Sequence, residues 1–183
     1  MTSTERPSDA GYDAIAKTFH WLVFALLATQ YALGWLMPHV GRNTKPEGLI
    51  AWHLWVGALL VLVLIVRIAW RLLRPVPLVM EDTPPWQIYI ARLTHWLLYL
   101  GLAVLLGLGW ANASARGWSV TLFGIFPLPP LSPVGARPGM EAGDVHSLLG
   151  WVLLAVIGLH VLAALYHYLI RRDQILQRML PRG

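Results

Sequence analysis

Seven histidines are the residues of this sequence best suited to chemistry, because six of them lie within or at the edge of long apolar stretches. The six are His20, His53, His95, His146, His160 and His167; only His39 falls clearly in a connection. An ionisable side chain in such surroundings is costly and usually faces the interior of a helical bundle or a cavity. Imidazole ligates metals and titrates near neutral pH. The six histidines therefore indicate a metal-binding or proton-transfer site.

Helical spacing places four of these histidines at two levels. Fourteen residues separate His146 from His160, and at 100° each they fall about 40° short of four turns. The two rings therefore share one helix face, about 21 Å apart along the axis. His53 and His20 each lie near the start of an apolar stretch. In an up-and-down bundle, His53 then shares a level with His146, and His20 shares the other level with His160.

Two imidazoles that face each other across a bundle suit the six-coordinate iron of a haem. The absence of cysteine excludes covalent c-type haem and cysteine-ligated iron–sulfur clusters, but haem b needs only axial bonds and packing. Zinc is the rival metal, yet a structural zinc takes four ligands and each level offers two. We therefore expect two haem b groups, one held by His53 and His146 and the other by His20 and His160.

Three further residues are placed to assist these sites. Arg67 lies fourteen residues after His53, so it shares that face at the other level, where it pairs with haem propionates or extends to the lipid headgroups like Arg71. Gly57 and Gly150 each lie four residues after a predicted ligand. They leave notches for the edge of a macrocycle, or they simply let membrane helices pack closely.

His95 and His167 remain without an iron to bind. His167 follows seven residues after His160 on nearly the same face, and His95 lies in the third apolar stretch. Both are suited to hydrogen-bonding a quinone carbonyl and relaying protons to it. The alternative is a histidine bonded to the backbone or to lipid.

Four stretches without Asp, Glu, Lys or Arg must position these residues. Each is 19 to 26 residues long, and about 20 residues of helix span the hydrocarbon core of a bilayer. Hydrophobic residues make up 57% of the chain and charged residues only 13%. We expect an all-α membrane protein, a four-transmembrane-helix bundle forming a single domain over residues 1–183. Its predicted helices cover about 14–37, 48–73, 86–111 and 144–170, and a loop on the periplasmic side covers 112–143.

The distribution of basic residues predicts the orientation. Ten Lys and Arg residues lie on the side of the two termini and four on the other side, and basic residues prefer the cytoplasm. Both termini should therefore be cytoplasmic, in a multi-pass membrane protein. The net charge of +5 flanks membrane segments, so we expect membrane lipid and no nucleic acid as its partner.

The chain resembles the bacterial cytochrome b561 family of small diheme membrane proteins. The resemblance runs from "TFHWLVFALL" through "WHLWVGALLVLVLIVRIAWRLLRP" and "RLTHWLLYLGLAVLLGLGW" to "VHSLLGWVLLAVIGLHVLAALYHY". It implies the same two ligand pairs, with His20 and His160 on the cytoplasmic side and His53 and His146 on the periplasmic side. It also implies that His95 and His167 lie at quinone-associated positions. "MEDTPP" departs from the basic character that the family shows before the third helix.

The activity that this resemblance implies is oxidation of superoxide to dioxygen at the periplasmic face, with electrons passed through two haems to ubiquinone. Such an enzyme is a superoxide:quinone oxidoreductase. Four basic residues on that side provide a field for steering superoxide, or are ordinary loop charges. They are Arg42, Lys45, Arg116 and Arg137. The alternative function is an electron-conduit or membrane-anchor cytochrome b subunit that exchanges electrons between quinone and a separate redox partner protein.

Overall fold

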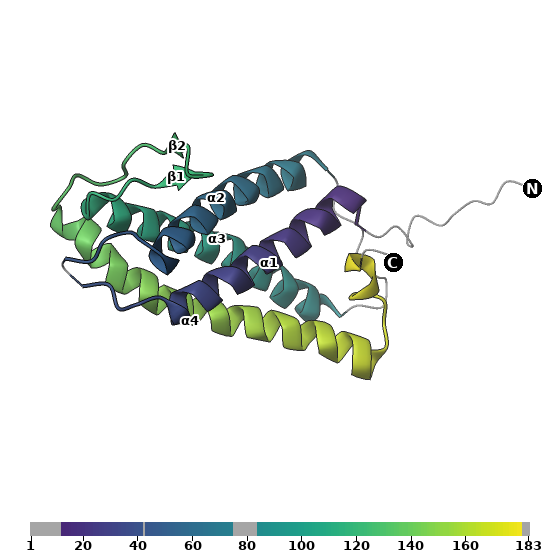
Figure 1. Cartoon of the computed structure of the whole chain (residues 1–183). Helices are drawn as coiled ribbons and strands as arrows, with labels where there is room; N and C mark the ends of the chain where they lie inside the picture. The colour runs from purple at the N-terminus through teal and green to yellow at the C-terminus, as the bar shows by residue number, and fades with distance from the viewer. Residues whose placement is uncertain (1–11, 42, 75–83, 181–183) are drawn as a thin grey trace, which may run out of the picture.

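The computed structural model describes residues 12–41, 43–74 and 84–180. Four long helices dominate this part of the chain (Figure 1). They are α1 (Ala14–Leu36), α2 (Leu49–Leu73), α3 (Pro85–Ala115) and α4 (Arg137–Tyr166). All four are long and apolar enough to cross a membrane. The predicted all-α membrane protein with four spanning helices is confirmed.

The helices run alternately up and down, with α1 packed along α2 and α3 along α4. The start of α1 and the end of α4 lie at the same end of the bundle, which we name the terminal end (Figure 1). The opposite end, the loop end, carries the α1–α2 connection and a small sheet. Large apolar side chains such as Trp96, Leu100 and Leu162 point outward, as expected for helices solvated by lipid.

The α3–α4 connection is shorter than the predicted loop over 112–143. Helix α3 continues to Ala115, and α4 begins at Arg137 rather than near residue 144. The predicted start of the fourth helix followed the charge-free stretch, whereas α4 begins before that stretch and includes charged residues. Pro138 suits a first helical turn, and Arg137 forms an ion pair with Glu141 one turn later, at 2.7 Å. At its other end α4 passes into a π-helical turn over His167–Arg171.

The connection contains an antiparallel pair of strands, β1 (Thr121–Leu122) and β2 (Phe126–Pro127). Gly124 lies in the tight turn between them with φ of +70°, where a residue without a Cβ is favoured. On its inner side the connection packs against α2 and α3: Val120 is buried together with Ala58 and Ala113. The loop is therefore fixed against the bundle.

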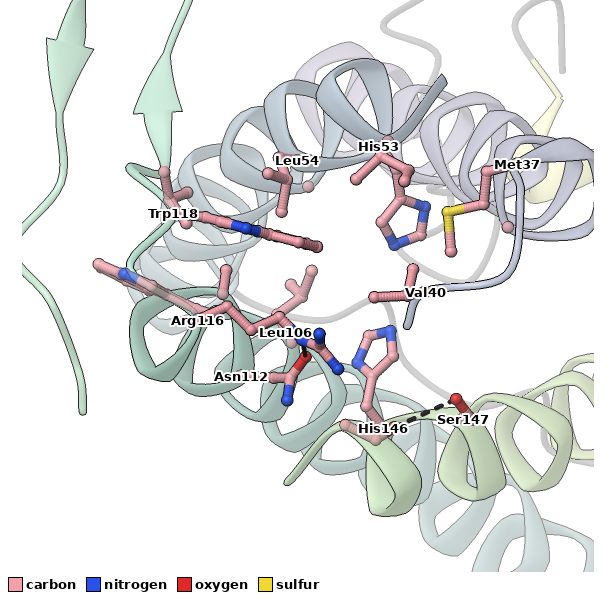
Figure 2. A pocket seen from close by; sticks show the side chains of 18 of the residues that line it. Met37, Val40, His53, Leu54, Leu106, Asn112, Arg116, Trp118, His146 and Ser147 are labelled. Carbon is pink, nitrogen blue, oxygen red and sulfur yellow. Dashed lines mark hydrogen bonds between the residues drawn. The ribbon is translucent and has the colours of Figure 1, made fainter. Parts of the chain in front are cut away.

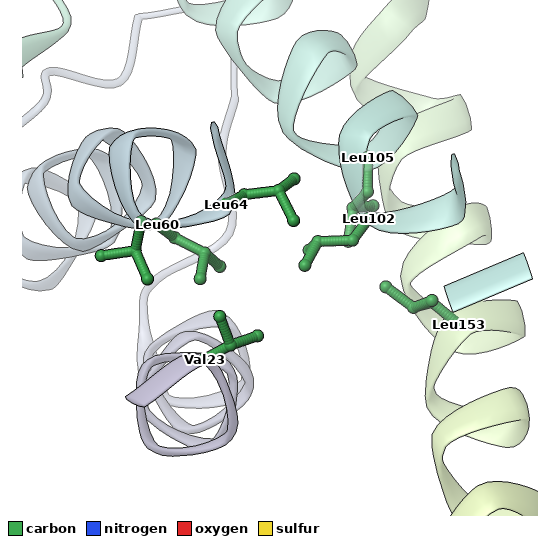
Figure 3. Packing of buried hydrophobic residues seen from close by; sticks show 7 residues of the cluster. Val23, Leu60, Leu64, Leu102, Leu105 and Leu153 are labelled. Carbon is green, nitrogen blue, oxygen red and sulfur yellow. The ribbon is translucent and has the colours of Figure 1, made fainter. Parts of the chain in front are cut away.

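Apolar side chains from all four helices meet in the middle of the bundle (Figure 3). Leu60 is the most buried of them, at 1% exposed, and Leu153 lies seven residues from each of His146 and His160. The other members are Val23, Val63, Leu64, Leu102 and Leu105. This core fills the space between the two histidine levels and holds them apart.

Candidate haem sites

His53 of α2 and His146 of α4 face each other at the loop end (Figure 2). Their ring centroids are 6.2 Å apart and the ring planes are 83° apart. Nδ1 of His146 lies 2.9 Å from the carbonyl oxygen of Leu105, which only accepts hydrogen bonds. Nδ1 therefore carries the proton and donates, and Nε2 is left with a free lone pair. This is the tautomer that an iron ligand needs.

A cavity of about 510 Å³ contains both rings. Met37 and Val40 line it from the α1–α2 connection, and Leu106 lines it from α3 (Figure 2). The α3–α4 connection covers it with Trp118, Val120 and Leu128. A volume of this size is typical of cofactor sites, which are mostly apolar with a few placed polar groups.

The residues present at the loop end fit a haem. Because imidazole bonds a first-row metal at about 2 Å, two rings that ligate one ion from opposite sides have centroids about 6 Å apart. The observed 6.2 Å agrees with that arrangement. Nδ1 of His53 is buried without a hydrogen-bond partner, which suits a ring whose partner is a bound group. In residues 12–41, 43–74 and 84–180, no group of three or more His, Cys, Asp or Glu is placed to hold a metal ion.

His20 of α1 and His160 of α4 form a second pair at the terminal end. Their centroids are 6.3 Å apart, nearly the same separation as at the loop end. Nη2 of Arg67 lies 3.2 Å from Nδ1 of His20, and Nε of Arg67 donates to the hydroxyl of Tyr99 at 3.1 Å. Arg67 therefore faces the histidine pair from α2 and is partly buried.

The two predicted quinone residues have different surroundings. The ring of His95 lies 5.5 Å from that of His160, and its Nδ1 donates to the carbonyl oxygen of Ala91 at 2.7 Å. His167 begins the π-helical turn, and its Nδ1 lies 2.6 Å from a carboxylate oxygen of Asp173. Each ring therefore has its Nδ1 fixed by an acceptor and its Nε2 available for a ligand. The residues of the "MEDTPP" segment up to Thr83 lie outside the described residues.

The three described steering residues, Lys45, Arg116 and Arg137, do not form one basic patch. Arg116 lines the cavity, where it donates to Asn112 and to the backbone oxygen of Gly41. Arg137 forms its ion pair with Glu141 on the outside of α4. Lys45 is exposed on the α1–α2 connection, and Arg42 lies outside the described residues. Arg116 alone among the three described residues lines the cavity, so it is the best placed to act on an anion there.

Four functional candidates were missed by sequence reasoning. A Cβ at Gly109 would lie 2.9 Å from the ring of His146, so Gly109 makes room for that ring. A Cβ at Gly150, by contrast, would meet no other atom within 4 Å. Gln30 donates to the backbone oxygen of His53. Tyr99 and Asp173 hold Arg67 and His167, respectively. Only Tyr99 had a sequence signal, since it lies one helical turn after His95.

A bundle of four membrane helices with facing histidines inside it defines a class, the haem-binding membrane proteins that transfer electrons. Residues 11–182 match the family described as prokaryotic cytochrome b561, and the chain belongs to this family. The family implies b-type haem, a redox role and a place in the bacterial inner membrane as a multi-pass protein.

Three relatives cover nearly the whole chain. Cytochrome b561 homolog 2 of Escherichia coli is 32% identical over 188 residues, covering 100% of this chain and 97% of its own length. The probable superoxide oxidase CybB of Yersinia pestis is 29% identical over 175 residues, covering 93% and 96%. Cytochrome b562 of Cereibacter sphaeroides is 27% identical over 178 residues, covering 94% and 96%.

Proposed function

We propose that this protein oxidises superoxide to dioxygen at the loop end and delivers the electrons to ubiquinone at the terminal end, through two haem b groups. The balanced reaction converts two superoxide anions, one quinone and two protons into two dioxygen molecules and one quinol. The observation that carries the proposal is the pair of facing histidines at each end of the bundle, with nearly equal ring separations of 6.2 and 6.3 Å. The similarity to a probable superoxide oxidase supports the choice of substrate.

We place the loop end in the periplasm and both termini in the cytoplasm. Arg67, Arg71 and Arg74 lie at the end of α2 that belongs to the terminal end, and Arg171 and Arg172 follow α4 there. Cytoplasmic flanks of membrane helices are enriched in Lys and Arg. Superoxide then enters from the periplasm, and quinone is reduced on the cytoplasmic side of the bilayer.

The loop-end residues orient the ligands and admit the anion. Leu105 fixes the ring of His146 through its carbonyl oxygen, and Gln30 anchors the backbone of His53. Haem bound there supplies one-electron chemistry between ferric and ferrous iron. Arg116 stabilises a negative charge in the cavity, because its guanidinium is held by Asn112 and Gly41 while it lines that space. Trp118 and Leu128 restrict the entry of bulk water.

Arg67 has a role at the terminal end that depends on occupancy of that site. It donates to Nδ1 of His20, so the proton of this neutral ring lies on Nε2. Ligation through Nε2 requires the opposite tautomer, with the proton on Nδ1. If His20 and His160 held a haem, Arg67 would no longer donate to His20 and would be placed to pair with the propionates, with its hydrogen bond to Tyr99 kept.

Reduction of quinone needs protons as well as electrons, and His167 is suited to supply them. Nδ1 of His167 donates a hydrogen bond to the carboxylate of Asp173, so Nε2 is the ring nitrogen left to carry a proton to a quinone carbonyl oxygen. His95 provides a second imidazole on α3, beside His160.

The test is quinol formation in proteoliposomes that contain the haem-loaded protein and ubiquinone. A superoxide source should drive quinol formation, and superoxide dismutase should abolish it. A His53→Leu variant should lose the activity, whereas a Glu47→Gln variant, altered at an exposed position of the α1–α2 connection at the same end, should keep most of it. A protein that is reduced only by a second polypeptide, and not by superoxide, would instead be the electron-conduit cytochrome b subunit.

A further inference from the structure

The α3–α4 connection has an apolar outer surface that the haem sites do not use. Residues 117–135 contain no Asp, Glu, Lys, Arg or His. Three large side chains at the tip of the β1–β2 hairpin are exposed: Phe123 by 62%, Ile125 by 71% and Phe126 by 62%. Soluble surfaces rarely leave such a cluster open to water unless it binds something.

We propose that this hairpin is immersed in the interface of the lipid bilayer at the loop end and anchors the cover of the cavity to the membrane. The inference uses the membrane-spanning fold alone and does not depend on superoxide as the substrate.

The hairpin lies beside α2, within the level of the membrane. A Cβ at Gly124 would be 3.8 Å from the ring of Trp55, so the turn rests against that side chain. Trp55 is six residues into α2, about 9 Å from the helix start. A 25-residue helix is about 37 Å long and exceeds a 30 Å hydrocarbon core by about 4 Å at each end. The turn therefore lies close to the boundary between the headgroups and the hydrocarbon core.

The apolar surface of the hairpin continues that of α2. Trp52 and Trp55 are 56% and 37% exposed and contact each other edge to face at 5.3 Å. Tryptophan is enriched where membrane proteins cross the headgroup region. Phe123, Ile125 and Phe126 add three exposed apolar side chains on either side of the turn that rests against Trp55.

Backbone hydrogen bonding limits how deep the hairpin lies. Leu122 accepts from the backbone nitrogen of Ile125 at 3.1 Å, and Val120 accepts from that of Leu128 at 2.8 Å. A two-stranded sheet still has open edges, which hydrocarbon does not satisfy. Immersion of about 5–10 Å into the headgroup and acyl boundary is the depth at which such a segment is stable.

Lipid fits this surface better than a soluble redox partner. Charge complementarity guides the encounter of transient partners, and the 117–135 stretch carries no charge to provide it. An immersed tip also holds Trp118 and Leu128 over the cavity from the opposite face of the same segment.

The absence of cysteine makes a direct test possible, because one introduced cysteine carries the only spin label. The haem-loaded Ile125→Cys and Phe126→Cys variants are labelled in vesicles of phosphatidylethanolamine and phosphatidylglycerol. Collision of the label with dioxygen, which concentrates in lipid, is compared with collision with a water-soluble nickel chelate. Arg137→Cys, whose native side chain is 89% exposed, is the aqueous control, and Leu100→Cys on the outer face of α3 is the lipid control.

We expect the oxygen-to-nickel collision ratio at residues 125 and 126 to lie between those of the two controls, at a depth of about 5–10 Å. A ratio equal to that at residue 137 would place the hairpin in water and overturn the proposal in favour of a surface for a soluble partner. Shielding from both reagents, with dipolar broadening between labels, would also overturn it, because a second copy of the chain would then cover the hairpin.

Discussion

Gly109 makes room for the ring of His146, and replacing it with alanine should weaken haem binding at the loop end alone. The added Cβ would lie 2.9 Å from Cε1 and 3.0 Å from Nδ1 of His146. Relief to an ordinary contact of 3.4 Å requires the ring to move by about 0.5 Å. That movement disturbs the 2.9 Å hydrogen bond from Nδ1 to Leu105, which orients the ring.

The expected magnitude follows from these two contacts. Crowding in a packed interior costs about 1–3 kcal/mol, and a lost hydrogen bond costs about 0.5–1.5 kcal/mol. A total near 2–4 kcal/mol corresponds to roughly 30- to 1,000-fold weaker binding. Helix α3 itself should persist, because alanine in a helix is more favourable than glycine by about 0.5–1 kcal/mol.

The assay is the haem content per protein after purification, together with a redox titration of the remaining haem. Gly107→Ala is the matched control, since Gly107 lies one half-turn away on α3 with nothing within 4 Å of its Cβ position. Gly109→Ala should lose one haem and keep the other, and Gly107→Ala should keep both. Equal haem content and equal potentials in the two variants would refute the role of Gly109.

Three further predictions concern other positions. His53→Leu should remove the loop-end haem and halve the haem content, measured as the pyridine haemochrome; retention of two haems would exclude His53 as a ligand. Asp173→Asn should leave reduction of the haems by superoxide unchanged and slow their reoxidation by quinone several-fold, because His167 loses the carboxylate at 2.6 Å. Single-turnover spectra separate the two steps, and equal slowing of both would argue against a role of Asp173 at the quinone site. Asp13→Ala should remove the N-cap of α1 and cost about 1 kcal/mol of unfolding free energy. The hydrogen bond from the backbone of Ala16 lowers the pKa of Asp13, so this stabilisation is present above the unfolded pKa of about 3.9 and is lost as pH falls through the lower folded pKa. The thermal unfolding midpoints of wild type and variant should therefore converge at low pH. A difference in midpoint that stays constant down to low pH would contradict the capping role.

The sequence predicted the four helices because charge-free stretches of membrane length are a strong signal. The pairing of His53 with His146, and of His20 with His160, as neighbours also followed from helical spacing, since helices that run up and down bring such levels together. Their assignment as iron ligands stays a prediction.

Contacts between distant segments were beyond sequence reasoning. Gly109 lies on α3, thirty-seven residues before the ring of His146 that it accommodates, and no local pattern links the two. Asp173 reaches His167 only because α4 ends in a π-helical turn with Arg172 in the left-handed region. Gly57 faces Gln30 instead of leaving an open notch, which depends on how closely α1 approaches α2.

The most direct measurement of the proposed function is stopped-flow reduction of the purified, oxidised, haem-loaded protein by a pulse of superoxide, followed in the haem bands. We predict reduction at a rate constant approaching about 10⁸–10⁹ M⁻¹s⁻¹, followed by reoxidation that requires added ubiquinone. Normal haem spectra with slow reduction, or with reoxidation that does not need quinone, would contradict superoxide-driven electron transfer to quinone.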